Sequence, residues 1–150
     1  MTFSRIMAGA ALTAVLAAPV TAQDNPAVGA RQGQFKLYSH NLAVLGGMAQ
    51  GKLDYDAGMA QTAADNLFHI TRHDQLRLWP EGPDSATIEG TRAKPAIWEN
   101  LDDFATKFGA LQEASATLQG AAGNGLDALR PAVGAVGKAC GACHEDYREE

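Results

Sequence analysis

The stretch Cys140-Gly141-Ala142-Cys143-His144 contains both cysteines of this 150-residue chain and a histidine directly after the second one. On a helix, which turns about 100° per residue, the side chains of Cys140, Cys143 and His144 leave the same face. C-x-x-C-H is the attachment sequence of c-type haem, in which two thiols add to the vinyl groups of one porphyrin and the histidine binds its iron. The stretch therefore predicts a helix that carries a covalently attached haem c, with His144 as an axial ligand of the iron.

Other roles for the two cysteines fit the sequence less well. A disulfide between residues three apart closes a very small loop and stabilises a fold little. A thioredoxin-like redox pair requires a βαβ setting, which the apolar pattern of this chain does not provide. A zinc site needs further ligands at matched spacing, and the chain has no second cysteine pair. Haem attachment is the interpretation that we favour.

Upstream of this motif, apolar residues recur every three or four positions, and no segment shows the alternation typical of β-strands. Phe35, Tyr38, Leu42 and Leu45, for example, lie within about 40° of one line along a helix. The pattern predicts four helices, over about 26–50, 54–76, 96–120 and from 126 onward, with a Pro- and Gly-rich connection at 79–95. Four long amphipathic helices with mostly short loops are typical of an all-α, antiparallel four-helix bundle.

The first 22 residues have the features of a secretory signal peptide. Arg5 gives a positive start, residues 6–18 are apolar, and residues 20–22 place small side chains before the expected cleavage point. The apolar stretch of about 13 residues is shorter than the roughly 20 that a membrane-spanning helix needs. We therefore expect residues 1–22 to be removed, and residues 23–150 to form one exported domain without a membrane anchor.

The composition fits one globular domain and excludes one class of partner. Apolar residues make up 46% of the chain, a normal share for a packed core. The chain has 12 Lys and Arg against 17 Asp and Glu, a formal net charge of −5. Nucleic-acid binding requires a basic patch, and the sequence contains no basic run. We expect no nucleic-acid partner.

Several segments together resemble the cytochrome c′ family, the high-spin branch of the class II c-type cytochromes. The resemblance rests on the haem motif with the following residues 145–148, on Lys94-Pro95-Ala96-Ile97-Trp98, and on residues 30–32 with Phe35 and Lys36. It implies a four-helix bundle with one haem c per subunit. It also implies a homodimer paired through the first two helices.

The sixth coordination position of the iron is expected to be vacant. In the related low-spin cytochromes, a methionine four residues after the equivalent of Arg31 binds the iron, and this chain has Phe35 there. A phenyl ring cannot coordinate iron, so the resemblance implies a five-coordinate, high-spin haem whose free face is covered by Phe35. Met48 and Met59 lie too far along the chain to bind the iron, and His40 lies on the opposite side of the first helix from Arg31.

Further residues are expected near the haem because they match family positions. Arg31 is expected to contact a haem propionate, and Gln32, Thr91 and Arg92 are expected near the haem edge. Arg148 resembles the basic residue beside the proximal imidazole. A cation near the end of a helix is also favoured by the helix dipole, so both interpretations of Arg148 stay open.

These features predict a periplasmic, non-enzymatic haem protein that acts in electron transfer, in binding of NO and CO, or in both. Exported redox proteins are the expected macromolecular partners. A low-spin electron carrier is the main alternative. A peroxidase is less suited, because it would need a distal acid–base histidine in a polar pocket. A purely structural bundle would carry no pigment.

Overall fold

The computed structural model describes residues 21–22 and 25–150. The predicted signal peptide therefore lies outside the described residues except for Thr21 and Ala22. Within the described part of the chain, the α-helices are α1 (Pro26–Ala49), α2 (Ala57–Thr71), α3 (Ala96–Glu99), α4 (Leu101–Ala121) and α5 (Leu126–Tyr147), with a 3-10 turn, η1 (Leu76–Leu78). No strand is present among these residues, only two isolated β-bridges.

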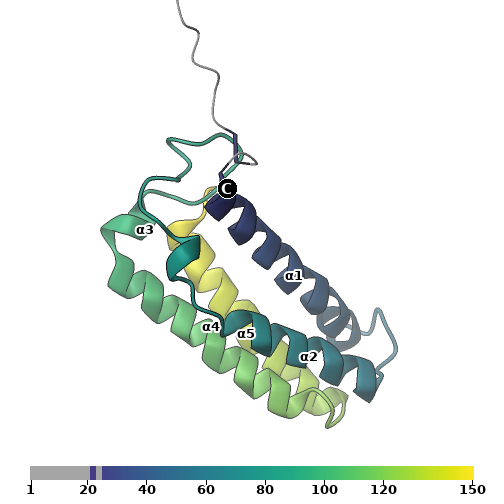
Figure 1. Cartoon of the computed structure of the whole chain (residues 1–150). Coiled ribbons are helices and arrows are strands. Elements are labelled where there is room, and N and C mark those ends of the chain that lie inside the picture. The colour runs from purple at the N-terminus through teal and green to yellow at the C-terminus, as the bar shows by residue number, and fades with distance from the viewer. Residues whose placement is uncertain (1–20, 23–24) are drawn as a thin grey trace, which may run out of the picture.

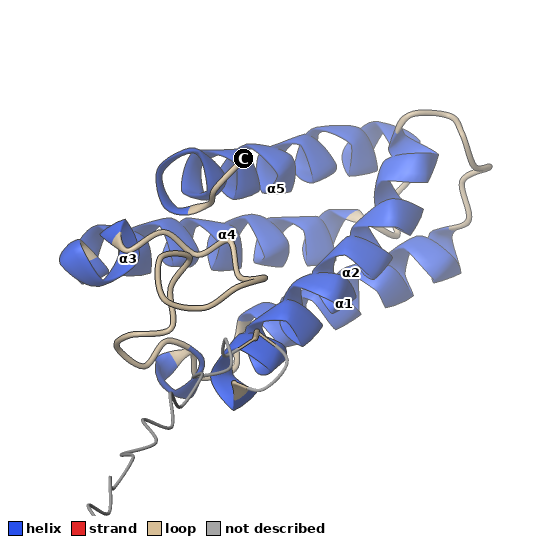
Figure 2. Ribbon diagram, turned by 90° about the horizontal axis from the view of Figure 1, so that it is seen from above, coloured by secondary structure: helices blue, strands red, loops and turns tan. Residues whose placement is uncertain are grey.

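The four long helices form the antiparallel bundle that the sequence predicts. α1 packs against α2 and α5, and α4 packs against α2 and α5, so the four helices enclose one core. Figure 1 shows the chain running down α1, back along α2, down α4 and back along α5. Figure 2 shows α4 and α5 side by side with their axes nearly aligned. The segment between η1 and α3 lies at one end of the bundle.

The core is apolar and is drawn from all four long helices. Its fully buried side chains include Leu45, Met48, Leu67, Leu118, Leu129 and Val136. Within it, the hydroxyls of Thr71 and Ser115 hydrogen-bond to each other at 2.9 Å, which satisfies two buried polar groups between α2 and α4. This core fills the end of the bundle away from the connection at 79–95.

Helix boundaries differ from the sequence prediction in two places. The second helix is shorter, because Asp56 rather than Asp54 caps it, accepting a hydrogen bond from the Met59 amide at 2.7 Å. At its other end, the His73 ring contacts the carbonyl oxygen of Ile70 at 2.7 Å and so satisfies a carbonyl of the last turn. Both ends are therefore set by side chains that bind the backbone.

The third predicted helix is interrupted at Asn100. Its backbone is not helical (φ −137°, ψ 50°), and it separates the single turn α3 from α4. The Asn100 side-chain amide donates to the Ala96 carbonyl oxygen at 3.2 Å. Short polar side chains that compete for backbone groups in this way favour helix ends over helix interiors.

The connection at 79–95 is tied to residues near both ends of the described chain. The Lys94 amide donates to the Tyr147 carbonyl oxygen, and the Glu149 amide donates to the Arg92 carbonyl oxygen. Gly90 has a positive φ of 85°, and a Cβ there would lie 3.3 Å from the Ala22 side chain, so glycine suits this close turn. The connection therefore closes one end of the bundle beside the last turns of α5.

Candidate cofactor site

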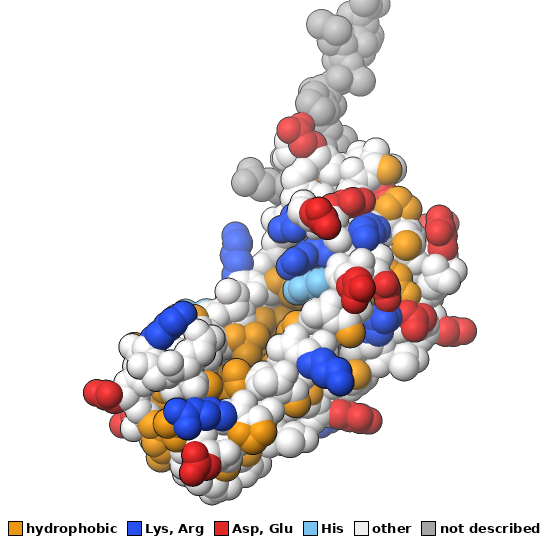
Figure 3. Space-filling model, turned by 180° about the vertical axis from the view of Figure 1, so that it is seen from behind, with side chains coloured by type: hydrophobic (Ala, Val, Ile, Leu, Met, Phe, Trp, Pro, Cys, Tyr) orange, Lys and Arg blue, Asp and Glu red, His pale blue; other side chains and the backbone are white. Residues whose placement is uncertain are grey.

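A cavity of about 760 Å³ lies between α1, α4, α5 and the connection at 79–95. Its size falls within the range of about 300–1,000 Å³ that is usual for ligand and cofactor pockets. Its walls are mainly apolar and include Val28, Phe35, Tyr38, Leu42, Trp79, Phe104, Phe108 and Leu111. Figure 3 shows this face of the molecule hollowed and lined with hydrophobic side chains, with a histidine at one end of the hollow.

The three side chains of the C-x-x-C-H motif all line this cavity. Cys140, Cys143 and His144 stand on the last turns of α5 and are each half-buried. Both cysteines are free thiols, so they do not form the small disulfide that the sequence left as an alternative. Burial raises the pKa of Cys140, and it raises the pKa of Cys143 to about 11. Two neutral thiols and an imidazole therefore face one apolar space.

The end of α5 that carries the motif is fixed to α4. Tyr147 is buried, and its hydroxyl donates to Asp103 at 2.7 Å. The Lys107 ammonium forms an ion pair with Asp146 at 2.7 Å and also reaches the carbonyl oxygen of Ala142. These contacts hold the motif's turn against α4, so its side chains are positioned by rigid helices on both sides.

His144 faces Phe35 across the cavity. The two ring centres are 6.4 Å apart, with 64° between the ring planes. Burial, and then the nearby positive charges of Arg148 and Arg92, lower the pKa of His144. Both effects favour the neutral imidazole, which is the form that binds a metal.

The Phe35 side chain is only partly buried. Its ring packs edge-on against Tyr38, with ring centres 5.6 Å apart, yet 39% of the residue is exposed. The sequence placed it on the same line of α1 as Leu45, which is fully buried. The difference arises because the bundle core stops short of Phe35, and the cavity begins there.

Arg31 is a buried cation at the cavity wall. It is 3% exposed, and its Nη2 donates to the Pro83 carbonyl oxygen at 2.7 Å. Its Nη1 is buried without a hydrogen-bond partner. Desolvation lowers the pKa of Arg31, and the charge of Asp84 opposes that effect. A buried guanidinium without an ion pair is costly, so this position favours an anionic group in the cavity.

The other residues that the sequence analysis placed near the haem edge also line the cavity. The Gln32 side chain donates to the Gly90 carbonyl oxygen at 2.9 Å, which ties α1 to the connection. Arg92 donates to the Glu149 carbonyl oxygen through Nε and Nη2, at 2.9 and 2.6 Å. Thr91 and Arg148 border the cavity as well, and Arg148 is exposed.

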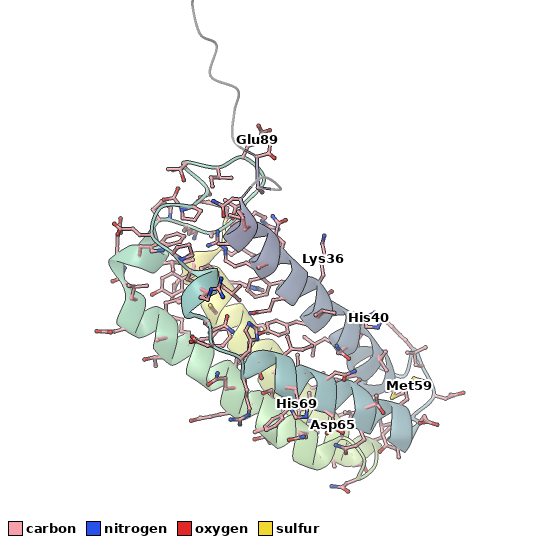
Figure 4. All side chains as sticks on the ribbon, in the orientation of Figure 1. Lys36, His40, Met59, Asp65, His69 and Glu89 are labelled. Atoms are coloured by element: carbon pink, nitrogen blue, oxygen red, sulfur yellow. The ribbon has the colours of Figure 1, made fainter. Side chains whose placement is uncertain are left out.

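Residues considered as alternative iron ligands lie elsewhere. Met48 is buried in the bundle core, and Met59 is exposed on α2. His40 is exposed on α1, and Figure 4 shows it projecting outward from the bundle. Among the described residues that line the cavity, His144 is the only histidine, and there is no methionine. No group of three or more His, Cys, Asp or Glu arranged to hold a metal ion occurs in the described part of the chain.

Trp79 and Lys107 are among the cavity residues that the sequence did not indicate. The sequence placed Trp79 only in the connection and gave Lys107 no role, yet both line the cavity. A large aromatic residue directly before Pro80 was a usable signal for Trp79, because an exposed loop rarely needs an indole. No comparable signal marked Lys107.

The residues present fit a haem. The apolar walls suit the porphyrin, and the thiols and imidazole of α5 lie together on one side of the cavity. Arg31 also lines the cavity, and its buried, unpartnered Nη1 favours a carboxylate nearby. No Asp or Glu of the described chain lines the cavity, so an acidic cofactor meets no like charge there.

Comparison with known proteins gives a consistent result. A family model described as "Cytochrome C'" matches residues 26–148. Cytochrome c-554 of Cereibacter sphaeroides is 41% identical, over 91% of this chain and 92% of that protein, and cytochrome c' of the same organism is 38% identical, over 96% and 97%.

Solved structures agree. Cytochrome c' from Rhodobacter Spheriodes matches with a TM-score of 0.82 and 39% identity, covering 87% of this chain and 99% of that one. A nitric oxide complex of a variant of cytochrome c prime from Alcaligenes xylosoxidans matches with a TM-score of 0.71 and 30% identity, covering 89% and 100%.

Proposed function

We propose that this chain, which belongs to the cytochrome c′ family of haem c proteins, carries a five-coordinate, high-spin haem. We propose further that it acts in the periplasm, where it binds NO and CO, transfers electrons, or does both. The haem supplies an iron that changes oxidation state by one electron and takes up diatomic gases. The protein's own residues decide how that iron is held, covered and reached.

In this proposal, Cys140 and Cys143 hold the haem through thioether bonds, and His144 binds the iron. Each thiol S–H adds across a vinyl C=C bond, so a C–S bond forms and no atom leaves. The support is the common placement of all three side chains on the cavity wall, with both thiols free. The lowered pKa of His144 supports its role too, because a neutral imidazole nitrogen has the lone pair that a metal needs.

The relation between Phe35 and His144 carries the proposal of a vacant sixth position. The Phe35 ring lies opposite the imidazole, with 6.4 Å between the two ring centres, and a phenyl ring has no lone pair to donate to iron. The described residues that line the cavity offer no methionine and no second histidine in its stead.

Phe35 also supports selection among gases. Its ring offers no hydrogen-bond donor, and bound O₂, which carries partial negative charge, needs one more than NO or CO does. Tyr38 also lines the cavity, but its hydroxyl donates to the Ile70 carbonyl oxygen at 3.4 Å. Because Phe35 is 39% exposed, it can swing outward at little cost and admit a small uncharged ligand.

Arg31 is proposed to bind a haem propionate. Its buried Nη1 has no partner in the protein, and a carboxylate would supply both the acceptor and the missing negative charge. Gln32 and Arg92 hold the connection in place by hydrogen bonds. Gln32 fastens it to α1, and Arg92 fastens it to the residues that follow α5. We propose that Thr91 lies at the haem edge and that Arg148 lies beside the His144 imidazole, where its charge adds to the effect of burial in lowering the pKa of His144.

Export and pairing are part of the same proposal. The features of residues 1–22 support a cleaved signal peptide, and no helix in the described part of the chain is long and apolar enough to cross a membrane. A homodimer through α1 and α2 is supported by the family resemblance and by Leu37 and Met59, which are 51% and 54% exposed on these helices. We propose no catalytic role, because the cavity lacks a distal acid–base histidine.

Optical and electron paramagnetic resonance spectra of the purified protein test this function. We expect covalently bound haem, a broad ferrous Soret band typical of five-coordinate iron, and a high-spin ferric signal. Exposure of the ferrous protein to NO or CO should change the spectrum, whereas O₂ should give no stable adduct. Sharp six-coordinate bands without added gas would instead favour the low-spin electron carrier, and a colourless protein would contradict the proposal altogether.

A further inference from the structure

Two of the residues that line the cavity each carry a buried hydrogen-bond donor without a partner. The donors are Nη1 of Arg31 and the indole Nε1 of Trp79. Buried donors in native proteins are almost always satisfied, so each unsatisfied one points to a missing acceptor. The third unsatisfied buried atom among the described residues is Oε1 of Gln34, which is itself an acceptor and does not line the cavity.

The two residues are neighbours, because the guanidinium of Arg31 lies over the Trp79 ring. The guanidinium carbon of Arg31 lies 4.6 Å from the centre of the Trp79 ring. The other terminal nitrogen of the guanidinium is fixed, because Nη2 donates to the Pro83 carbonyl oxygen at 2.7 Å. Arg31 therefore cannot turn away to find another partner without breaking that bond. A single acceptor group placed beside these residues would satisfy both.

The Trp79 ring is also fixed. It packs against Phe104 with ring centres 4.7 Å apart and against Trp98 at 6.3 Å. Trp98 makes an informative contrast, because its own Nε1 donates to the Pro80 carbonyl oxygen at 2.9 Å. Of the two indoles in this aromatic cluster, one is satisfied by the protein and the other lines the cavity without a partner.

A carboxylate is the group that fits both donors. It has two oxygens that accept in different directions, and its charge compensates a buried guanidinium, which a water molecule or an amide cannot do. A haem held in this cavity would bring its propionate carboxylates with it. We infer that Trp79 is a second propionate-binding residue, whose indole N–H donates to the same haem carboxylate that Arg31 binds.

This inference rests on the proposed placement of the haem and adds a function for the connection at 79–95. Trp79 belongs to that connection, whereas Arg31 belongs to α1. A carboxylate shared between them would link the connection to α1 through the cofactor. Trp79 would then be a positioning residue, because it sets the haem edge and does not touch the iron.

Trp79→Phe tests the inference, because it keeps an aromatic ring in the cluster and removes the N–H. Trp98→Phe is the matched control, since it removes an indole whose N–H is bound to the backbone. In resonance Raman spectra of the haem-loaded ferric proteins, the propionate-bending band should shift in Trp79→Phe and keep its wild-type position in Trp98→Phe. The iron midpoint potential should fall in Trp79→Phe only, because a less stabilised carboxylate favours ferric iron.

A second measurement does not depend on the stability of Trp79→Phe. The chain has two tryptophans, so Trp98→Phe leaves Trp79 as the single indole. Ultraviolet resonance Raman of that variant should show the indole N–H band in its strongly hydrogen-bonded position. A band typical of a free indole would overturn the inference, as would an unshifted propionate band in folded Trp79→Phe. Normal haem spectra in either case would leave the proposed function standing.

Discussion

Phe35 on α1 and His144 on α5 face each other across the cavity with 6.4 Å between their ring centres. One ring carries a nitrogen that binds metals, and the other carries only carbon and hydrogen. The fold therefore presents a ligand to one side of the space and a hydrocarbon cover to the other. Three predictions about ligand access, coordination and helix anchoring follow from the residues around this pair.

Replacing Phe35 with Ala should speed association of CO with the ferrous protein. The variant removes the ring that must move before a gas can reach the iron. We expect a rise of about tenfold, which corresponds to about 1.4 kcal/mol removed from the barrier. Flash photolysis or stopped-flow mixing measures the rate. Leu37→Ala is the control, because Leu37 is exposed on the same helix and does not line the cavity. Equal CO association rates in wild type and Phe35→Ala would show that Phe35 does not control access to the iron.

Replacing Phe35 with Met should change the spin state. A thioether at this position is similar to the arrangement that the sequence resemblance describes for low-spin relatives. Met is unbranched and flexible, so its sulfur can reach toward the ring position that Phe35 now occupies opposite His144. We expect sharp low-spin bands and slower CO binding, because the sulfur must leave first. A spectrum that stays high-spin would show that α1 lies too far from the iron for this ligand.

Tyr147→Phe should destabilise the end of α5 that carries the haem motif. The substitution keeps the ring, which packs edge-on against Phe104 with ring centres 5.4 Å apart, and removes the hydroxyl that donates to Asp103. The expected loss in the free energy of unfolding is about 1 kcal/mol, measured by urea denaturation of the haem-loaded protein. Asp103→Asn, which keeps a carbonyl acceptor, should cost less. Unfolding curves of Tyr147→Phe that overlay those of wild type would contradict the anchoring role.

Asp65 should make the bundle sensitive to acid. It lies on α2 (Figure 4) and accepts hydrogen bonds from Gln119 on α4 at 3.0 Å and from Gln61 at 2.9 Å. These bonds, that from Gln119 first, lower the pKa of Asp65 below its ordinary value of 3.8. A carboxyl group whose pKa is lower in the folded state stabilises the fold above its ordinary pKa, and this contribution is lost as the pH falls through the folded-state pKa.

The thermal midpoint of Asp65→Asn should therefore depend less on pH below about 4 than that of wild type. Asp54→Asn is the control, since Asp54 is exposed before α2 and the structure shows no hydrogen bond to its side chain. Identical pH profiles for wild type and Asp65→Asn would mean that the link between α2 and α4 contributes nothing measurable.

The sequence predicted the parts of this structure that depend on spacing. The 3.6-residue period placed the four long helices, and Pro26 marked the start of α1 correctly. It also predicted that Cys140, Cys143 and His144 share a face, and the structure brings all three to one cavity. These results follow from local geometry alone.

What the sequence did not predict depends on contacts between distant residues. The break at Asn100 and the cap at Asp56 reflect which side chain captures a backbone group, and period arguments do not rank such competitors. Trp79 reaches the cavity only because the connection folds back beside α5 and α1. The sequence expected Phe35 at the cofactor, but it did not predict that the core begins only at Tyr38, one turn further along α1, which leaves Phe35 39% exposed.

The proposed homodimer gives the last prediction. Leu37 on α1 and Met59 on α2 are each about half exposed, and an acidic side chain at either position would bring desolvation cost and charge repulsion into a pairing through these helices. In analytical ultracentrifugation, Leu37→Glu and Met59→Glu should sediment as monomers at concentrations where wild type is dimeric. Leu101→Glu should remain a dimer, because Leu101 is 52% exposed on α4, outside the proposed interface. Dissociation of Leu101→Glu alone would move the interface to α4, and a monomeric wild-type protein would exclude the homodimer while leaving the haem site intact.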